Sequence, residues 1–397
     1  MTDMELSELS NRLRALAIFR GLLSEPVIGS LCGYLDSLED PCPQKVASAY
    51  GELVSRLFQA GDGDLGLHIR RAVEGSDNAY IRAVGRGETP PAYMERCLEE
   101  ELNTLQAAAS LTPEILRAGL EGMDYLPDFG AASVKLAGGY RRRLAEVGRY
   151  GWGIYARNSV FCLDEAGRIT PVRHPDPIGL DDLVGYERER GLILDNVQAL
   201  LAGRPAANML LTGDAGTGKS STVKAVGNAL RDEGLRIIEV RREQLRHIPG
   251  LLDELGENPL KFLLFIDDLS FQKDDDNYSA LKAVLEGSVS ARSGNVVLCA
   301  TSNRRHLVKE RFSDREGDEI HRNDAMQELV SLSERFGLHV TFQKPDKEGY
   351  LEIVHALARR QGVQCPDLDM LAERFVLGRG GRSPRAARQF VDSLTVK

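Results

Sequence analysis

The sequence lacks several features that would place it in a special class of protein. It has no apolar run of about 18 residues, the length that a bilayer span needs, so no membrane span is predicted. Its six cysteines are scattered singly, without a Cys-x-x-Cys pair or zinc-like spacing, which predicts reduced thiols. The N-terminal stretch carries acids ahead of its apolar part and lacks the small-residue cleavage site of a signal peptide. We therefore expect a cytoplasmic protein.

The sequence also lacks the excess of positive charge that nucleic-acid capture requires. It contains 50 Lys and Arg against 59 Asp and Glu, which gives a net charge of −9. This balance argues against broad electrostatic binding of nucleic acid, but it does not exclude a local basic patch. Hydrophobic residues at 42 % and charged residues at 27 % are ordinary globular values, so disorder and coiled-coil rods are excluded. The length of 397 residues predicts two or three domains at about 150 residues each.

The chain divides into four predicted segments. Residues 1–150 have apolar side chains at helical spacing, with Leu6, Leu9, Leu13 and Leu16 as one example, and predict a helical domain. Such a stripe is either a bundle core, which we prefer, or a dimer seam. Residues 151–177 predict a β-rich linker, with two short strands at 154–163 and 169–172 followed by a proline-rich connector.

The second half alternates short apolar runs with amphipathic stretches. Such alternation predicts an α/β core over residues 178–344 with a parallel, five-stranded sheet. Residues 345–397 predict a small helical piece that ends the chain. The five predicted strands are residues 208–211, 236–240, 262–266, 296–300 and 339–342.

The clearest chemical motif is a glycine-rich loop between a predicted strand and a predicted helix. Residues 213–220 match the pattern G-x-x-x-x-G-K-[ST] throughout. Glycines let successive backbone N–H groups point at phosphates, and the following helix N-terminus adds partial positive charge. Lys219 would reach the β- and γ-phosphates, and the Ser220 hydroxyl would bind Mg²⁺. An ordinary glycine turn would not explain this lysine and serine. The predicted phosphate-binding residues are Gly213, Asp214, Ala215, Gly216, Thr217, Gly218, Lys219, Ser220 and Ser221.

A second motif lies 48 residues after Lys219, where the apolar run 262–266 ends in two aspartates. A carboxylate at the end of a strand beside the phosphate loop can complete the magnesium shell, and we assign this role to Asp267. Asp268 is the candidate general base that polarises the attacking water. The competing interpretation is two acids that simply open a surface loop.

The two motifs resemble the Walker A and Walker B motifs of AAA+ ATPases. The chain is similar to a bacterial family of predicted AAA+ ATP-binding proteins that carries only a domain-of-unknown-function label. The resemblance covers residues 178–390 well and the N-terminal helices loosely. It implies a P-loop NTPase core with a C-terminal helical lid. The stretches that carry it are 213–221, 265–271, 281–287, 300–307 and 333–338.

The resemblance implies further roles for single residues. Asn303 stands where AAA+ proteins carry the first sensor, which positions water near the γ-phosphate. Arg335 stands where they carry an arginine finger that acts on the neighbouring subunit's nucleotide, although a solvated arginine at a helix end is the alternative. Arg385 resembles the second sensor, with Arg382 and Arg388 as competitors. Leu183, Val184 and Gly185 resemble the stretch that meets adenine, and the chain has no guanine-reading N-K-x-D sequence.

One departure bears on turnover. AAA+ motors usually carry Asp-Glu where this chain has Asp267-Asp268, and the shorter carboxylate places fast hydrolysis in doubt. We expect an oligomeric Mg²⁺-dependent ATPase that remodels or loads an unknown macromolecule, protein or nucleic acid, through its N-terminal domain. The alternative is a slow-hydrolysing, ATP-dependent switch or binding module. A nucleic-acid loader is a further analogy at the level of the fold.

Overall fold

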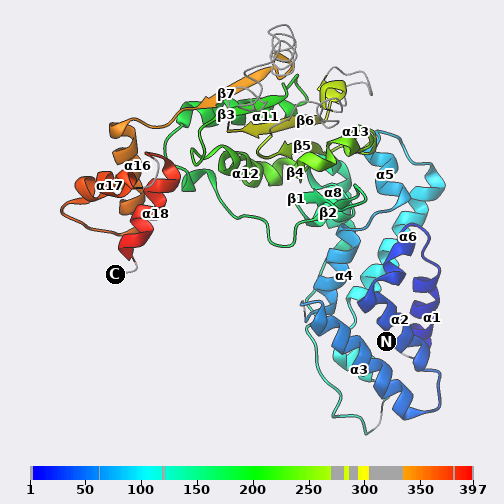
Figure 1. Ribbon diagram of the computed structural model, residues 1–397. Helices are drawn as coiled ribbons and strands as arrows, with labels where there is room; N and C mark the ends of the chain where they lie inside the picture. Colours follow the sequence, from blue (N-terminus) through cyan, green and yellow to red (C-terminus); the bar gives the residue numbers. More distant parts are fainter. Residues whose placement is uncertain are drawn as a thin grey trace. The chain divides into compact units, whose positions relative to one another are not determined.

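The computed structural model describes residues 3–61, 63–118, 120, 122–269, 281–285, 294–303, 334–378 and 381–395. The chain forms two compact units, Met1–Arg157 and Asn158–Lys397, and Figure 1 colours them in chain order. Among the described residues, no helix is both long and apolar enough to cross a membrane. All six cysteines lie in the described part and are free thiols.

The first unit is built from helices, as the periodicity of residues 1–150 predicts. Favourable first turns start several of them: Glu25 accepts from the N–H groups of Val27 and Ile28, and Pro26 follows it. The predicted stripe Leu6–Leu16 is buried in the unit's core. Its elements are α1 (Asp3–Arg14), η1 (Arg20–Ser24), α2 (Pro26–Ser37), α3 (Pro43–Gln59), α4 (Leu65–Glu74), α5 (Ala79–Gly85), α6 (Ala92–Ala109), α7 (Pro113–Arg117), α8 (Leu136–Ala145), α9 (Val147–Tyr150) and α10 (Ile154–Arg157).

The second unit contains a sheet and the helices that cover it. Within the described residues the sheet has seven strands in the order β2-β1-β4-β5-β6-β3-β7, and all neighbours except β1 and β2 are parallel. The strands are β1 (Val160–Leu163), β2 (Ile169–Pro171), β3 (Met209–Gly213), β4 (Leu235–Glu239), β5 (Lys261–Ile266), β6 (Val296–Ser302) and β7 (Leu338–Phe342). Helical elements before β7 include η2 (Leu180–Asp182), α11 (Glu187–Leu201), α12 (Lys219–Leu230), η3 (Arg231–Glu233), η4 (Arg242–His247) and α13 (Ile248–Gly256).

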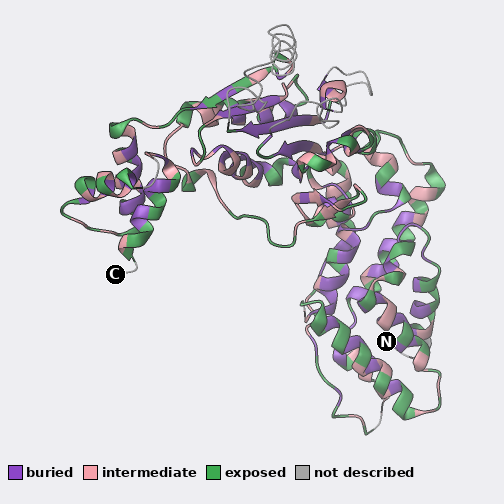
Figure 2. Cartoon of the chain, in the orientation of Figure 1, coloured by how far each residue is buried: buried purple, intermediate pink, exposed green. Residues whose placement is uncertain are grey.

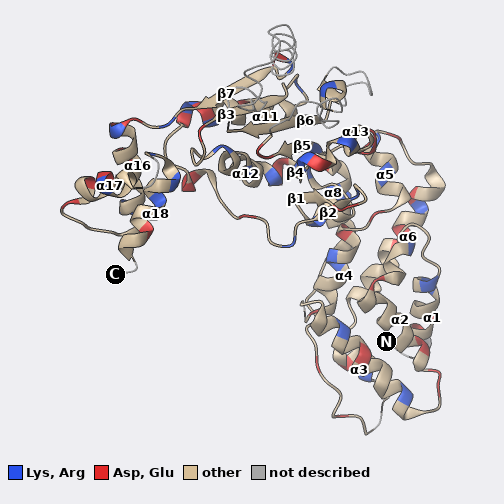
Figure 3. Cartoon of the chain, in the orientation of Figure 1, with Lys and Arg blue, Asp and Glu red and all other residues tan. Residues whose placement is uncertain are grey.

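The α/β class and the parallel core predicted for an AAA+ P-loop NTPase are confirmed, but the number of strands is not five. All five predicted core strands form, as β3 to β7. Helices α11 and α12 contribute to one apolar cluster with the sheet, and Figure 2 shows the strands mostly buried. Figure 3 shows basic and acidic residues interspersed along the chain.

The two additional strands come from the segment that we expected to be a linker. Strand β1 pairs in parallel with β4, so Phe161 lies opposite Ile238 and the edge of the core sheet is covered. The predicted strand at 154–163 is wrong in its first part, because Ile154–Arg157 forms the helix α10. Sequence periodicity did not predict this pairing because the partner strand lies more than 70 residues further along the chain.

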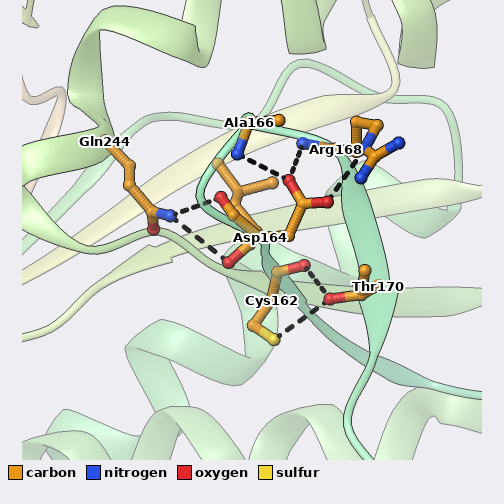
Figure 4. Close-up of polar contacts among 7 residues, drawn as sticks. Cys162, Asp164, Ala166, Arg168, Thr170 and Gln244 are labelled. Atoms are coloured by element: carbon orange, nitrogen blue, oxygen red, sulfur yellow. Dashed lines mark hydrogen bonds and ion pairs between the residues drawn. The ribbon is translucent and has the colours of Figure 1, made fainter.

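The turn between β1 and β2 is held at both ends (Figure 4). The Asp164 carboxylate accepts from the N–H groups of Ala166 and Arg168, each at 2.9 Å, and from the Arg168 guanidinium. Gln244 of η4 donates to the backbone oxygens of Leu163 and Asp164 at 3.3 and 2.9 Å. The hairpin is therefore fastened to the segment that follows β4 and is an integral part of the second unit.

The chain ends in a helical lid with an apolar core of its own. It contains α16 (Lys347–Gln361), α17 (Leu368–Leu377) and α18 (Pro384–Thr395), drawn in orange to red in Figure 1. Tyr350, Val354 and Phe390 are among its buried side chains. These helices form the small helical piece predicted over residues 345–397, and α18 begins at Pro384 after Ser383, whose Oγ accepts from the N–H of Ala386.

Candidate nucleotide-binding site

The site lies at the carboxyl edge of the sheet. Because β3, β5 and β6 are parallel neighbours in the order β5-β6-β3, the residues that follow them meet at one edge. This places the glycine-rich loop after β3, the two aspartates after β5 and Asn303 after β6 close together. The sequence predicted Asp267 beside the loop from its place at a strand end, and the family resemblance implied the place of Asn303.

The glycines of the loop are needed for its backbone conformation. Gly213 has φ 139°, and a Cβ there would lie 2.0 Å from the carbonyl oxygen of Phe342 on β7. Gly216 and Gly218 also have positive φ, at 80° and 97°. Gly218 precedes α12, which begins at Lys219, so the loop leads directly into a helix N-terminus. The geometry is that of an anion cradle.

Lys219 is directed into this edge and is 5 % exposed. Its Nζ donates to the backbone oxygens of Gly213 and Asp214, each at 2.8 Å, and to Asn303 Oδ1 at 2.9 Å. Burial lowers the pKa of Lys219, and the nearby carboxylates, Asp267 foremost, oppose this shift. A buried ammonium group in a cradle of this shape is suited to a polyanionic ligand.

Asp267 is held by hydroxyl groups from two elements. Its Oδ1 accepts from Ser220 Oγ of α12 and from Thr301 Oγ1 of β6, each at 2.6 Å. The serine hydroxyl and the carboxylate are hard oxygen ligands on the same side of the loop. This donor set fits Mg²⁺, which is usually bound by one or two protein oxygens together with water and phosphate. No group of three or more His, Cys, Asp or Glu gathers as a metal cage within the described residues.

Asp268 has a left-handed backbone, with φ 51°. Its N–H donates to Thr301 Oγ1 at 2.9 Å, and its carboxylate accepts from Asn303 Nδ2 at 2.8 Å. Asp and Asn tolerate this conformation better than longer side chains do. Asn303 thus lies between Lys219 and Asp268, and binds one through its oxygen and the other through its nitrogen.

These residues line a cavity of about 450 Å³, a volume typical of small-ligand sites. Gly213, Asp214 and Arg335 are not among its lining residues. The cavity extends from the loop to apolar side chains of the lid and of the segment before α11, including Ile178, Ile353 and Leu357. The predicted site residues on its lining are Val184, Gly185, Ala215, Gly216, Thr217, Gly218, Lys219, Ser220, Ser221, Asp267, Asp268, Asn303 and Arg385, together with Leu183.

The three candidate lid arginines have different surroundings. Arg382 binds Glu373 with two hydrogen bonds of 2.9 and 2.6 Å inside the lid. Arg385 lines the cavity, and its backbone N–H donates to the Gly216 carbonyl at 3.2 Å. Arg388 also lines the cavity and donates to the Asp182 carbonyl at 3.1 Å. This arrangement favours Arg385 as the lid residue nearest the phosphate loop.

Arg335 lies at the opposite edge of the sheet. It precedes β7, which runs parallel to β3 with Leu338 opposite Met209 and Phe342 opposite Gly213. Arg335 is therefore beyond the amino end of β7, whereas the phosphate loop follows the carboxyl end of β3. The structure places this arginine away from its own chain's cavity. The resemblance stretches at 270–271, 286–287, 304–307 and 333 lie outside the described residues.

Thr301 and Arg190 are among the polar residues of the site that sequence reasoning missed. Thr301 fixes both Asp267 and the backbone of Asp268, and the signal for it was its place near the end of an apolar strand. Arg190 of α11 lines the cavity and donates to the carbonyls of Leu180 and Leu183 at 3.1 and 3.2 Å. No motif pointed to Arg190, which also pairs with the Glu187 carboxylate at 2.9 Å in the first turn of its own helix.

Comparisons with known proteins matched one family profile, and they matched solved structures at low sequence identity. The sequence profile of a family described as "Protein of unknown function (DUF815)" matches residues 156–397. No curated protein matches the chain in sequence.

Among solved structures, RuvB from Thermotoga maritima, described as a Holliday junction branch migration motor, is 22 % identical with a TM-score of 0.36. That alignment covers 55 % of this chain and 66 % of RuvB, so the chain spans slightly less than two thirds of its length. DnaA from Aquifex aeolicus, bound to AMPPCP, is 15 % identical with a TM-score of 0.38, and the alignment covers 57 % of this chain and 67 % of DnaA.

Proposed function

The chain belongs to the family of proteins of unknown function designated DUF815, and on that premise we propose that it is an AAA+ protein that binds Mg²⁺-ATP and hydrolyses it. One observation carries the proposal: Lys219, Ser220, Asp267 and Asn303 converge on one glycine-rich loop at the carboxyl edge of the sheet. Phosphoryl transfer needs positioning and charge stabilisation above all, and these residues supply both.

Each residue has a proposed task in the reaction. The amides of the loop and the ammonium group of Lys219 bind the phosphate oxygens, and Ser220 and Asp267 hold Mg²⁺, which neutralises developing charge when bound. Asp268 accepts a proton from the attacking water, whose oxygen bonds to the γ-phosphorus as the bond to the ADP oxygen breaks. Asn303 orients Asp268 and the water beside it.

A slow switch is the second candidate, and Asp268 favours it. Its carboxylate is one methylene shorter than the glutamate of AAA+ motors, and Asn303 already binds it at 2.8 Å. Both constraints limit its reach toward a water molecule. In this case the protein binds ATP and signals by a change in its lid, with negligible turnover.

We further propose that the protein assembles as a homo-oligomer, with Arg335 acting on the nucleotide of a neighbouring subunit. The position of Arg335 on the side of the sheet away from its own cavity is consistent with a role in trans. The helical N-terminal unit is the proposed contact for a macromolecule, protein or nucleic acid, that ATP hydrolysis remodels or loads.

Two measurements on the purified full-length chain test these proposals. Calorimetric titration with Mg²⁺-ATP tests binding, and release of inorganic phosphate over time tests hydrolysis. Steady phosphate release favours the ATPase, whereas binding without release favours the switch. The absence of binding to ATP and ADP, with or without Mg²⁺, would overturn both.

A further inference from the structure

One irregular segment beside the cavity is held by side chains from three different helices. This segment, residues 176–183, includes η2 and none of the sheet's strands. Asn228 of α12 donates to the carbonyls of Asp176 and Ile178, each at 2.8 Å. Arg190 of α11 donates to the carbonyls of Leu180 and Leu183, and Arg388 of α18 donates to that of Asp182.

The same segment forms part of the cavity wall. Ile178, Asp182 and Leu183 line the cavity, together with residues of the phosphate loop. Within the segment, the Asp182 carboxylate accepts from the Gly179 N–H at 2.7 Å and fixes its bend. Two apolar side chains of the lid helix α16, Ile353 and Leu357, line the cavity as well. The apolar side chains of Ile178, Leu183 and Ile353 give the cavity a surface that suits the flat face of a nucleoside base.

Asn228 connects this wall to the phosphate cradle through a single helix. It follows Lys219 by nine residues on α12, or about 14 Å along the axis at about 1.5 Å per residue. The N-terminal end of α12 therefore carries the phosphate contacts, and its last turns carry the 176–183 segment. The separation between the cradle and the wall is set by a rigid element.

We infer that Asn228 is a positioning residue that fixes the 176–183 segment as the base-side wall of the nucleotide cavity, so that it determines affinity for the nucleoside part of the ligand and not for its phosphates. This inference rests on the proposed function. Loss of the two donated hydrogen bonds releases the first part of the segment from α12. The cradle at the other end of the helix keeps its contacts.

The experiment compares ligands that have a base with one that lacks it. Binding of Mg²⁺-ATP, Mg²⁺-ADP and inorganic Mg²⁺-tripolyphosphate is measured by calorimetry on the wild-type chain and on Asn228→Ala. We expect ATP and ADP to bind about tenfold more weakly to the variant, in line with two lost hydrogen bonds. Tripolyphosphate is expected to bind within about twofold of the wild type. In turnover, KM for ATP rises while kcat at saturation is retained.

Asn196→Ala is the matched control. Asn196 of α11 also bridges a helix to a backbone segment, with two hydrogen bonds of 2.9 Å to Ala207, but it does not line the cavity. It should leave the ratio of ATP to tripolyphosphate affinity unchanged. Arg388→Ala provides a second variant, because it removes the exposed lid contact to the Asp182 carbonyl. It should lower ATP affinity about threefold and leave tripolyphosphate affinity unchanged.

The outcomes are distinguishable. If Asn228→Ala binds ATP and tripolyphosphate as the wild type does, or weakens both equally, the inference is wrong while the proposed function stands. If the wild-type chain binds none of the three ligands, the proposed function itself fails. A selective loss of ATP and ADP affinity supports both.

Discussion

Asn303 donates its side-chain N–H to the carboxylate of Asp268 at 2.8 Å, although 35 residues separate the two in the chain. This hydrogen bond holds the Asp268 carboxylate in one orientation at the cavity wall. The same asparagine accepts from Lys219 at 2.9 Å. The side-chain amide of Asn303 thus connects the candidate base Asp268 with the proposed phosphate-binding residue Lys219. A substitution at each of these two residues tests its role separately.

Asp268→Asn is expected to abolish hydrolysis and to retain ATP binding. Asparagine fits the left-handed backbone at φ 51° as well as aspartate does, and its oxygen can still accept from Asn303. It cannot take a proton from water, so kcat should fall by about 10²- to 10⁴-fold. ATP affinity measured by calorimetry should stay within about threefold. Phosphate release at the wild-type rate would remove Asp268 from the mechanism.

Lys219→Ala is expected to abolish nucleotide binding while the fold is retained. The ammonium group contacts backbone oxygens at the cavity and not the apolar core, so its removal leaves the packing intact. Charge-assisted hydrogen bonds to phosphate contribute about 1.5–3 kcal/mol each, so the affinity for ATP should fall at least about 100-fold. Circular dichroism and the melting temperature report on the fold.

Lys224→Ala is the control for this variant. Lys224 lies on the same helix and pairs with Glu239 at 3.7 Å, but it does not line the cavity. ATP affinity should be unchanged in it. Undiminished affinity in Lys219→Ala would refute the assignment of the loop.

The lowered pKa of Lys219 predicts a pH dependence of binding. Burial places this pKa below its usual value of 10.5, so the ligand-free lysine loses its proton at a lower pH than a solvated one does. Only the charged form neutralises phosphate. Because ATP stabilises the charged form, affinity should be highest below the lowered pKa and should fall as the pH rises through it toward 10.5.

The measurement is a series of titrations from about pH 8 to the usual lysine pKa of 10.5, a range in which phosphate, with a pKa of about 6, is already fully ionised. Proton uptake on binding, read from buffers of different ionisation enthalpy, should increase across this range. A flat profile together with constant proton exchange would contradict the role of this lysine.

The sequence predicted the part of the site that depends on local pattern. The loop 213–220 is one continuous motif, and Asp267 was assigned from its place at the end of an apolar strand, whereas the role of Asn303 came from the family resemblance; the order β5-β6-β3 brings all three together. The β1–β2 hairpin was assigned to a linker because its pairing with β4 is a long-range interaction. Arg190 and Asn228 were not predicted because their contacts to the 176–183 segment are made to backbone oxygens, which leave no trace in residue identity.

Arg335→Ala tests action between subunits. If Arg335 stabilises transition-state charge on a neighbour's nucleotide, its removal should lower kcat by about 10³-fold or more and leave ATP affinity largely unchanged. The chain's own cavity does not include Arg335, so an effect on kcat without an effect on affinity would point to an acceptor site on another subunit. Phosphate release and analytical ultracentrifugation with Mg²⁺-ATP measure turnover and assembly.

Mixing variants separates action in trans from action within one chain. Arg335→Ala subunits keep Lys219, and Lys219→Ala subunits keep Arg335, so a mixed oligomer contains interfaces at which both residues are intact. An equal mixture of these two inactive variants should therefore recover part of the wild-type turnover. The control replaces the Lys219→Ala partner by a chain that carries both substitutions, and it should recover none. If the first mixture stays inactive although the two variants assemble together, Arg335 does not act on a neighbouring site. In that case an interface with both Lys219 and Arg335 intact supports no hydrolysis.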